Sequence, residues 1–166
     1  MIRRLVALVF ALALAGCATA ERYDAAGDIH NFLIAVRDGD RAVFDAHVDR
    51  PALKANLKAR LLATTAGRYG LGSAQTAGAM LAQPLVDLAV DALVRPQVFK
   101  AAAELAGYGP DIRIPGGLAL GQKVRPIGSD TVCAIIKDRC AFVFKHEDGT
   151  WRLIDFEGDL ALLNPP

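Results

Sequence analysis

The chain has little of what enzymes and nucleic-acid-binding proteins usually carry. Its 19 basic and 18 acidic side chains nearly balance, whereas nucleic-acid binding depends on a concentrated basic face. It has only two serines, Ser73 and Ser129, and neither lies in the G-x-S-x-G pattern of a nucleophile elbow. Phosphate-loop and zinc-protease spacings are also absent from the sequence. These absences argue against nucleic acid as a partner and against the common classes of enzyme.

An apolar run long enough to cross a membrane is missing at the N-terminus. Leu5 to Ala15 has 11 residues, whereas a helix that spans a bilayer needs about 20. The run follows Arg3 and Arg4 and narrows to the small residues that precede Cys17. A basic start, an apolar run and small residues form the layout of a secretory signal, here with a cysteine where an ordinary signal would be cut. The segment therefore predicts export and no permanent transmembrane helix.

The tetrapeptide Leu14-Ala15-Gly16-Cys17 resembles the lipobox of bacterial lipoproteins. The resemblance implies that the Cys17 sulfur carries diacylglycerol, that residues 1–16 are removed, and that the new N-terminus is acylated as well. Two or more acyl chains hold a protein firmly on a membrane. Ala18, in place of Asp, implies the periplasmic face of the outer membrane. The alternative is a lipid-free signal cut at Ala18-Thr19-Ala20, which has the A-x-A form.

The part after the signal has the size and composition of one folded domain. Removing residues 1–16 leaves 150 of the 166 residues and a net charge near −1. A chain of this length can bury its own core, and its content of Ala, Leu and Val argues against disorder. We expect a tether at residues 17–24, a single α+β domain at 25–160 and a tail at 161–166.

Apolar spacing predicts a helical first half. Ile29, Phe32 and Val36 belong to one helical stripe that ends at Asp38-Gly39. Further helices are expected after the capping residue Asp40 and in the apolar stretch that follows a glycine-rich segment at 66–78. In all we expect about five helices, near residues 25–38, 41–48, 51–65, 83–93 and 96–106.

Beyond Gly109-Pro110 the apolar period changes from 3.6 to 2. Asp148-Gly149 between two apolar runs is a strong hairpin signal. Helices first and an antiparallel meander of three or four strands last give an α+β fold with the helices packed on the sheet. This order resembles the cystatin-like and nuclear-transport-factor-like superfamilies, which implies an apolar pocket between a curved sheet and a helix. The expected strands are residues 118–126, 130–136, 140–145 and 150–156.

Parts of the helical half resemble a bacterial family known as the domain of unknown function number 2939. They are Ala35 to Asp40, Val48 to Lys58, and Leu93 to Pro96. The likeness extends over roughly residues 27–106. It implies that Asp40 and Asp49 are helix caps, and it carries across no catalytic residue and no ligand.

Cys133 and Cys140 remain once Cys17 is assigned to lipid, an even pair in an exported chain. They flank a hairpin turn. If the turn is Ile136-Lys137, the two cysteines lie directly opposite each other. If it is Lys137-Asp138, they are offset by two positions and a disulfide requires a bulge. The other interpretation is two small, half-buried thiols.

The three histidines and the acidic end of the chain offer only weak candidate sites. His30, His47 and His146 lie on separate predicted elements; His47 is expected to be packed or bonded to a helix cap, and His146 to be solvated. Three alternating carboxylates could hold Ca²⁺, but they do not continue into a calcium loop. We therefore expect no metal and no cofactor. The carboxylates are Asp155, Glu157 and Asp159.

The basic residues of the third predicted helix are expected to form an exposed face, with contact to anionic lipid head groups as the less favoured interpretation. They are Arg50, Lys54, Lys58 and Arg60.

These observations favour a non-enzymatic, membrane-anchored lipoprotein that binds an envelope protein or has a structural role in the envelope. The alternative is a carrier of a small apolar ligand between sheet and helices, which requires an apolar pocket and is contradicted by a filled interior. An enzyme is the third hypothesis, and it requires titratable groups that converge, for instance His47 and Asp155.

Overall fold

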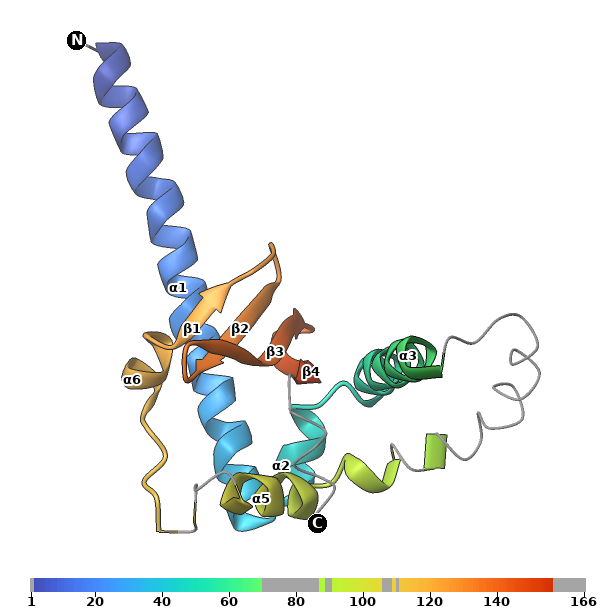
Figure 1. The fold of residues 1–166 in the computed structure, drawn as a ribbon. Helices are drawn as coiled ribbons and strands as arrows, with labels where there is room; N and C mark the ends of the chain where they lie inside the picture. Colours follow the sequence, from blue (N-terminus) through green and yellow to red (C-terminus); the bar gives the residue numbers. More distant parts are fainter. Residues whose placement is uncertain (1, 70–86, 89–90, 106–108, 110, 157–166) are drawn as a thin grey trace.

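The fold is described by a computed structural model that covers residues 2–69, 87–88, 91–105, 109 and 111–156, with side chains described for 19–60 and the later ranges. Helices come first and strands last, so the predicted α+β class is confirmed (Figure 1). The helices are α1 (Ile2–Asp38), α2 (Arg41–Ala46), α3 (Arg50–Tyr69), α5 (Pro96–Leu105) and α6 (Gly117–Gly121). The strands are β1 (Val124–Pro126), β2 (Thr131–Ile136), β3 (Arg139–Glu147) and β4 (Thr150–Phe156).

The four strands form an antiparallel meander in the order β1-β2-β3-β4. Two of its turns, Lys137-Asp138 and Asp148-Gly149, have positive φ at both residues. Left-handed backbone at both central positions is the geometry of the tight type I′ hairpin turn, which matches the twist of the flanking strands. The predicted Asp-Gly hairpin is confirmed, and β4 has the predicted bounds.

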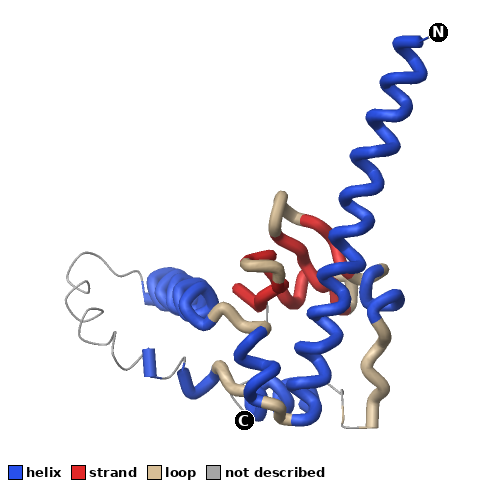
Figure 2. The backbone as a smooth tube through the Cα atoms, turned by 180° about the vertical axis from the view of Figure 1, so that it is seen from behind, coloured by secondary structure: helices blue, strands red, loops and turns tan. Residues whose placement is uncertain are grey.

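The core lies between the second half of α1 and the sheet, with α2 and α5 closing one end (Figure 2). Phe32 of α1 is at its centre: its ring centroid lies 5.5 Å from that of Phe44, 5.6 Å from that of Phe144 and 6.0 Å from that of Phe99. Side chains of the chain itself therefore fill this space. The phenylalanines in contact are Phe32, Phe44, Phe99, Phe142, Phe144 and Phe156.

Residues 17–24, expected as a tether, belong to α1, so that prediction is wrong. Ala18 and Ala20 favour helix, and no glycine or proline interrupts the segment. Contacts with the rest of the domain, described below for Arg22 and Asp24, also hold it in place. The ordered domain thus begins before residue 25.

The first expected strand, 118–126, is also wrong in its first half. Residues 117–121 form α6, and only Val124–Pro126 pair as β1. The alternation of Leu118 and Leu120 is too short to distinguish a strand from one turn of helix, and glycines at both ends of α6 disfavour a strand.

The remaining helix predictions agree with the structure in part. Asp40 caps α2 by accepting hydrogen bonds from the backbone N–H groups of Ala42 and Val43, and Asp49 accepts one from Ala52 at the start of α3. Among the described helices only α1, α3 and α5 are longer than six residues. Most of the expected glycine-rich stretch and of the helix at 83–93 lies outside the described residues, which include helical residues at 87–88 and 91–93.

Candidate functional site

Cys17 lies in α1, the helix that also supplies the centre of the core. The N-terminal half of α1 extends past the sheet, away from the other elements (Figure 1, Figure 2). The predicted attachment point and the core residues Ala25, Ala26 and Ile29 therefore share one continuous helix.

α6 holds α1 shortly after Cys17. The Arg22 guanidinium donates to the Gly121 carbonyl from Nε at 3.2 Å and from Nη2 at 2.8 Å. The Tyr23 ring lies over Gly121, where an added Cβ would come within 2.5 Å of Cδ1. Only glycine allows the ring to approach this closely, because a Cβ atom does not tolerate a contact this short. This contact fixes α1 on its side of the sheet.

Two carboxylates of α1 hold one residue of β4. Asp24 Oδ2 accepts a hydrogen bond from the Trp151 indole Nε1 at 2.9 Å, and Asp28 Oδ2 accepts one from the Trp151 backbone N–H at 2.8 Å. Residues four apart on a helix share a face, so both carboxylates reach the same strand. Trp151 is only 2% exposed. Neither carboxylate was predicted; the signal that could have found them is their spacing beside the apolar stripe.

His47 joins this contact from α2. It is the C-terminal cap residue of α2 and is 9% exposed. Its Nδ1 lies 2.8 Å from the Val43 carbonyl, so Nδ1 carries the proton and donates. Its Nε2 lies 3.6 Å from Asp28 Oδ1. The prediction that His47 is packed or bonded near a helix cap is confirmed, and its acidic neighbour is Asp28.

His47 and Asp155, the example given of convergent titratable groups in an enzyme, bond to different partners. Asp155 instead forms an ion pair with Arg60 of α3, at 2.5 Å. Glu157 and Asp159 lie outside the described residues. Within the described ranges, no three His, Cys, Asp or Glu side chains gather closely enough to hold a metal ion.

The other histidines lie apart from His47. His30 Nδ1 is 2.9 Å from the Pro115 carbonyl, and His146, which is exposed as predicted, places its ring centroid 5.0 Å from that of Trp151. Beside His146, Lys145 and Glu147 form an ion pair at 2.7 Å, and this hydrogen bond raises the pKa of the Lys145 amine.

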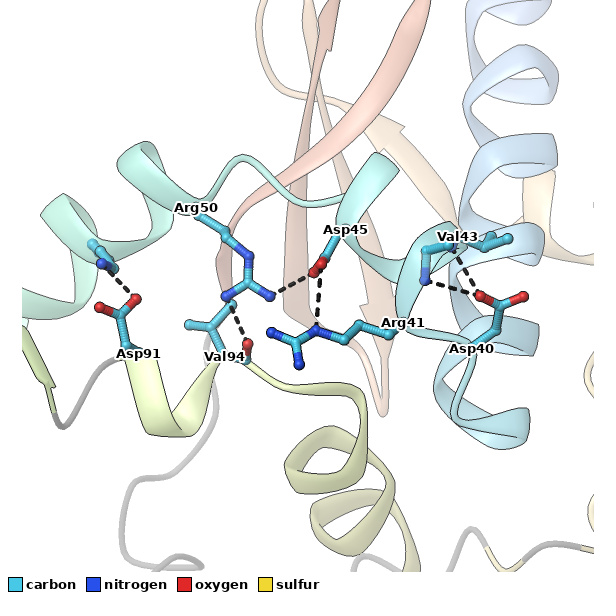
Figure 3. Close-up of polar contacts among 9 residues, drawn as sticks. Asp40, Arg41, Val43, Asp45, Arg50, Asp91 and Val94 are labelled. Carbon is cyan, nitrogen blue, oxygen red and sulfur yellow. Dashed lines mark hydrogen bonds and ion pairs between the residues drawn. The ribbon is translucent and has the colours of Figure 1, made fainter.

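The basic residues of α3 are paired with acids, which corrects the expected exposed cationic face. Arg50 illustrates this (Figure 3): Nη2 lies 2.5 Å from Asp45 Oδ1, and Nη1 donates to the Val94 carbonyl at 2.9 Å. Asp45 is also within 3.7 Å of Arg41 Nε. Arg50 therefore connects α2 to the chain before α5.

The two lysines of α3 pair with the two acids of the apolar stretch before α5. Lys54 Nζ lies 2.5 Å from Asp91 Oδ1, and Lys58 Nζ lies 3.8 Å from Asp87 Oδ1. The earlier lysine, Lys54, pairs with the later acid, Asp91, and the later lysine, Lys58, pairs with the earlier acid, Asp87. The two segments therefore run antiparallel. These acids neutralise the lysines, which removes the support for contact with anionic head groups.

Cys133 and Cys140 are joined by a disulfide, with their Cα atoms 5.7 Å apart. The hairpin turn is Lys137-Asp138, the alternative in which a bridge requires a bulge. The bulge is present: Cys140 pairs with Ile135, whereas Phe142 pairs with Ala134. Cys133 itself pairs with Val143, so the extra residue of β3 lies between Cys140 and the residue opposite Cys133.

None of the described helices is both long and apolar enough to cross a bilayer. No curated protein and no solved structure matches the chain. The family model described as "Protein of unknown function (DUF2939)" matches residues 9–102, more than half of the chain. The match includes Cys17, α2 and α3, and it ends before the sheet. The chain therefore belongs to the DUF2939 family of proteins of unknown function.

Proposed function

We propose that the protein is a lipoprotein anchored by acyl chains on Cys17, with its domain on the periplasmic face of the bacterial outer membrane. One observation carries the proposal: of the three cysteines, Cys133 and Cys140 are used in a disulfide, and the remaining one ends the basic, apolar and small-residue segment. A disulfide also suits an oxidising compartment such as the periplasm.

The family match supports this anchor. It begins at residue 9, inside the apolar run, so the segment around Cys17 belongs to the region that is typical of the family. A leader unrelated to the domain would lie outside such a match. Two or more acyl chains at Cys17 would hold the protein durably on the membrane.

For the domain itself we propose a non-catalytic role, either binding of an envelope protein or a structural part in the envelope. Its best-placed titratable groups already stabilise the fold: Asp28 and His47 bond to Trp151 and Val43. The phenylalanine cluster fills the space between α1 and the sheet in the described part of the chain. This packing favours a solid domain over a carrier of a small apolar ligand.

Intact-mass spectrometry of protein purified from bacterial membranes tests the anchor. We expect loss of residues 1–16 and added acyl mass on Cys17, both abolished by Cys17→Ser. The matched control is the double variant Cys133→Ser, Cys140→Ser, which keeps the acyl mass. A chain that is cut after Ala20 and carries no lipid would overturn the proposal.

A further inference from the structure

We infer that the domain rests directly on the lipid surface through the β1–β2 tip, residues 127–130, and does not hang from a flexible tether. This inference rests on the proposed lipid at Cys17. It adds the face of the domain that meets the membrane and the chemistry by which that face does so.

The first step is the short, rigid connection between the anchor and the domain. Cys17 and Arg22 lie in the same helix, and Arg22 already bonds to Gly121 of α6. Because a helix rises 1.5 Å per residue, the backbones of Cys17 and Arg22 are only about 7.5 Å apart along the axis. No glycine or proline interrupts the helix between them. The acyl chains therefore bring the domain within about one and a half helical turns of the bilayer.

The second step is the orientation that the helix imposes. The β1–β2 tip and the N-terminal half of α1 lie at the same end of the molecule, whereas α5 lies at the opposite end (Figure 1, Figure 2). α6 lies beside the middle of α1, farther from that end than the tip. A membrane at the level of the anchor thus meets the tip before the other parts of the sheet.

The third step is the chemistry of the tip. Ile127 is 58% exposed, and its backbone N–H donates to the Thr131 carbonyl at 2.9 Å, which closes the turn beneath it. Arg125 of β1 and Lys123, which precedes β1, are also exposed. The acids beside the tip include Asp130, whose carbonyl accepts a hydrogen bond from the His146 backbone N–H, and the neighbouring Glu147, which is paired with Lys145. An apolar side chain flanked by cations suits the boundary between acyl chains and anionic head groups.

Leu118 provides a matched control. It is an apolar residue with 78% exposure, more than Ile127, but it lies on α6. Apolar exposure alone would therefore favour Leu118 as the membrane contact. The orientation of α1 favours Ile127. Comparing the two positions therefore distinguishes nonspecific apolar contact with the membrane from contact that the orientation of the domain determines.

The test uses the full lipidated protein in vesicles of phosphatidylethanolamine with one-quarter phosphatidylglycerol. Ile127→Cys and Leu118→Cys are each labelled with an environment-sensitive fluorophore; with Cys17 acylated and Cys133 bridged to Cys140, the new thiol is the only free one. Lipids that carry a nitroxide near the head group then act as quenchers. We expect a blue shift and at least threefold stronger quenching at position 127 than at position 118.

Two results would overturn the inference and leave the anchor intact: no quenching at position 127 in protein that floats with the vesicles, or equal quenching at both positions. The first would mean that the domain stands away from the bilayer or is covered by another protein copy. The second would mean that it lies on a different face. Protein without acyl mass that does not float would overturn the anchor and the inference together.

A second variant tests the rigid connection. Inserting Gly-Ser-Gly-Ser-Gly-Ser between Thr19 and Ala20 adds a flexible span of about 13 Å. It leaves Arg22, Tyr23 and the core unchanged. We expect flotation to persist and quenching at position 127 to fall at least twofold. Unchanged quenching would show that the tip reaches the membrane independently of the helix, and it would contradict the orienting role of α1.

Discussion

α1 and the outer side of α3, the side that carries Lys54 and Lys58, are attached to the rest of the domain by different kinds of contact. Asp24 and Asp28 of α1 bond to Trp151, which is 2% exposed. Lys54 of α3 pairs with Asp91, and these side chains are 31% and 46% exposed. Leaving a buried donor unpaired costs about 1–3 kcal/mol, whereas an exposed ion pair contributes about 0–1 kcal/mol and is screened by salt. The attachment of α1 should therefore withstand conditions that loosen the outer side of α3.

The largest loss of stability is expected when the side chain of α1 at the centre of the core, Phe32, is truncated. Phe32→Ala removes a ring that contacts four others, which should lower the free energy of unfolding by about 3–5 kcal/mol. Urea unfolding followed by the fluorescence of Trp151, the single tryptophan, measures this. The control is Leu88→Ala, in the segment whose acids pair with α3. Leu88 is exposed, so this change is expected to alter stability by less than about 0.5 kcal/mol. Equal losses in the two variants would contradict the comparison.

The next effect isolates the buried hydrogen bonds. Asp28→Ala leaves the Trp151 backbone N–H without its acceptor and should cost about 1–3 kcal/mol. Asp28→Asn keeps an acceptor oxygen and should recover part of that loss. Asp91→Ala, the counterpart in the exposed pair, should cost no more than about 1 kcal/mol. If Asp91→Ala proves the more damaging variant in urea unfolding, the distinction between the two attachments is wrong.

Glycine substitutions test α1, the helix that contains Cys17. Gly27 lies inside α1, and nothing lies within 4 Å of an added Cβ. Gly27→Ala should therefore stabilise the domain by about 0.5–1 kcal/mol. Gly39→Ala is the control with the opposite sign, because Gly39 has φ +73°, where alanine is strained. A loss of stability in Gly27→Ala would mean that this part of α1 is not helical in solution.

The smallest effect concerns salt. Raising the ionic strength from 0.05 to 0.5 M should reduce the contribution of the Lys54–Asp91 pair, which is about 1 kcal/mol at most, toward zero. A double-mutant cycle of Lys54→Ala and Asp91→Ala at the two salt concentrations measures that coupling. The same cycle for Asp28 and His47, which are 3.6 Å apart and less exposed, should change less with salt.

The strands near the C-terminus were predictable because their signals are local. Asp148-Gly149 marks a tight turn, and alternation in the flanking residues sets the bounds of β4. The helix caps at Asp40 and Asp49 were predictable for the same reason, since a capping side chain bonds within three residues of itself.

The candidate site was harder to predict from the sequence because its contacts join residues that are far apart in the chain. Asp24 and Asp28 are acceptors for a residue more than 120 positions away, and their spacing beside the apolar stripe does not identify that residue. The pairs of Lys54 and Lys58 follow from two equal four-residue spacings, but only once the antiparallel arrangement is known. The disulfide lies between these cases: its two geometries could be written down from the sequence, and the choice between them depended on the turn.

The bonds from α1 to Trp151 also determine when the domain can form. Their partners are separated by 123 and 127 residues, so a chain that is still emerging, or is truncated before β4, has neither. Long separations of this kind delay closure of the core until nearly the whole chain is available. A protein threaded through a membrane N-terminus first gains from this order, because the segment that enters first has no folded partner to obstruct its passage.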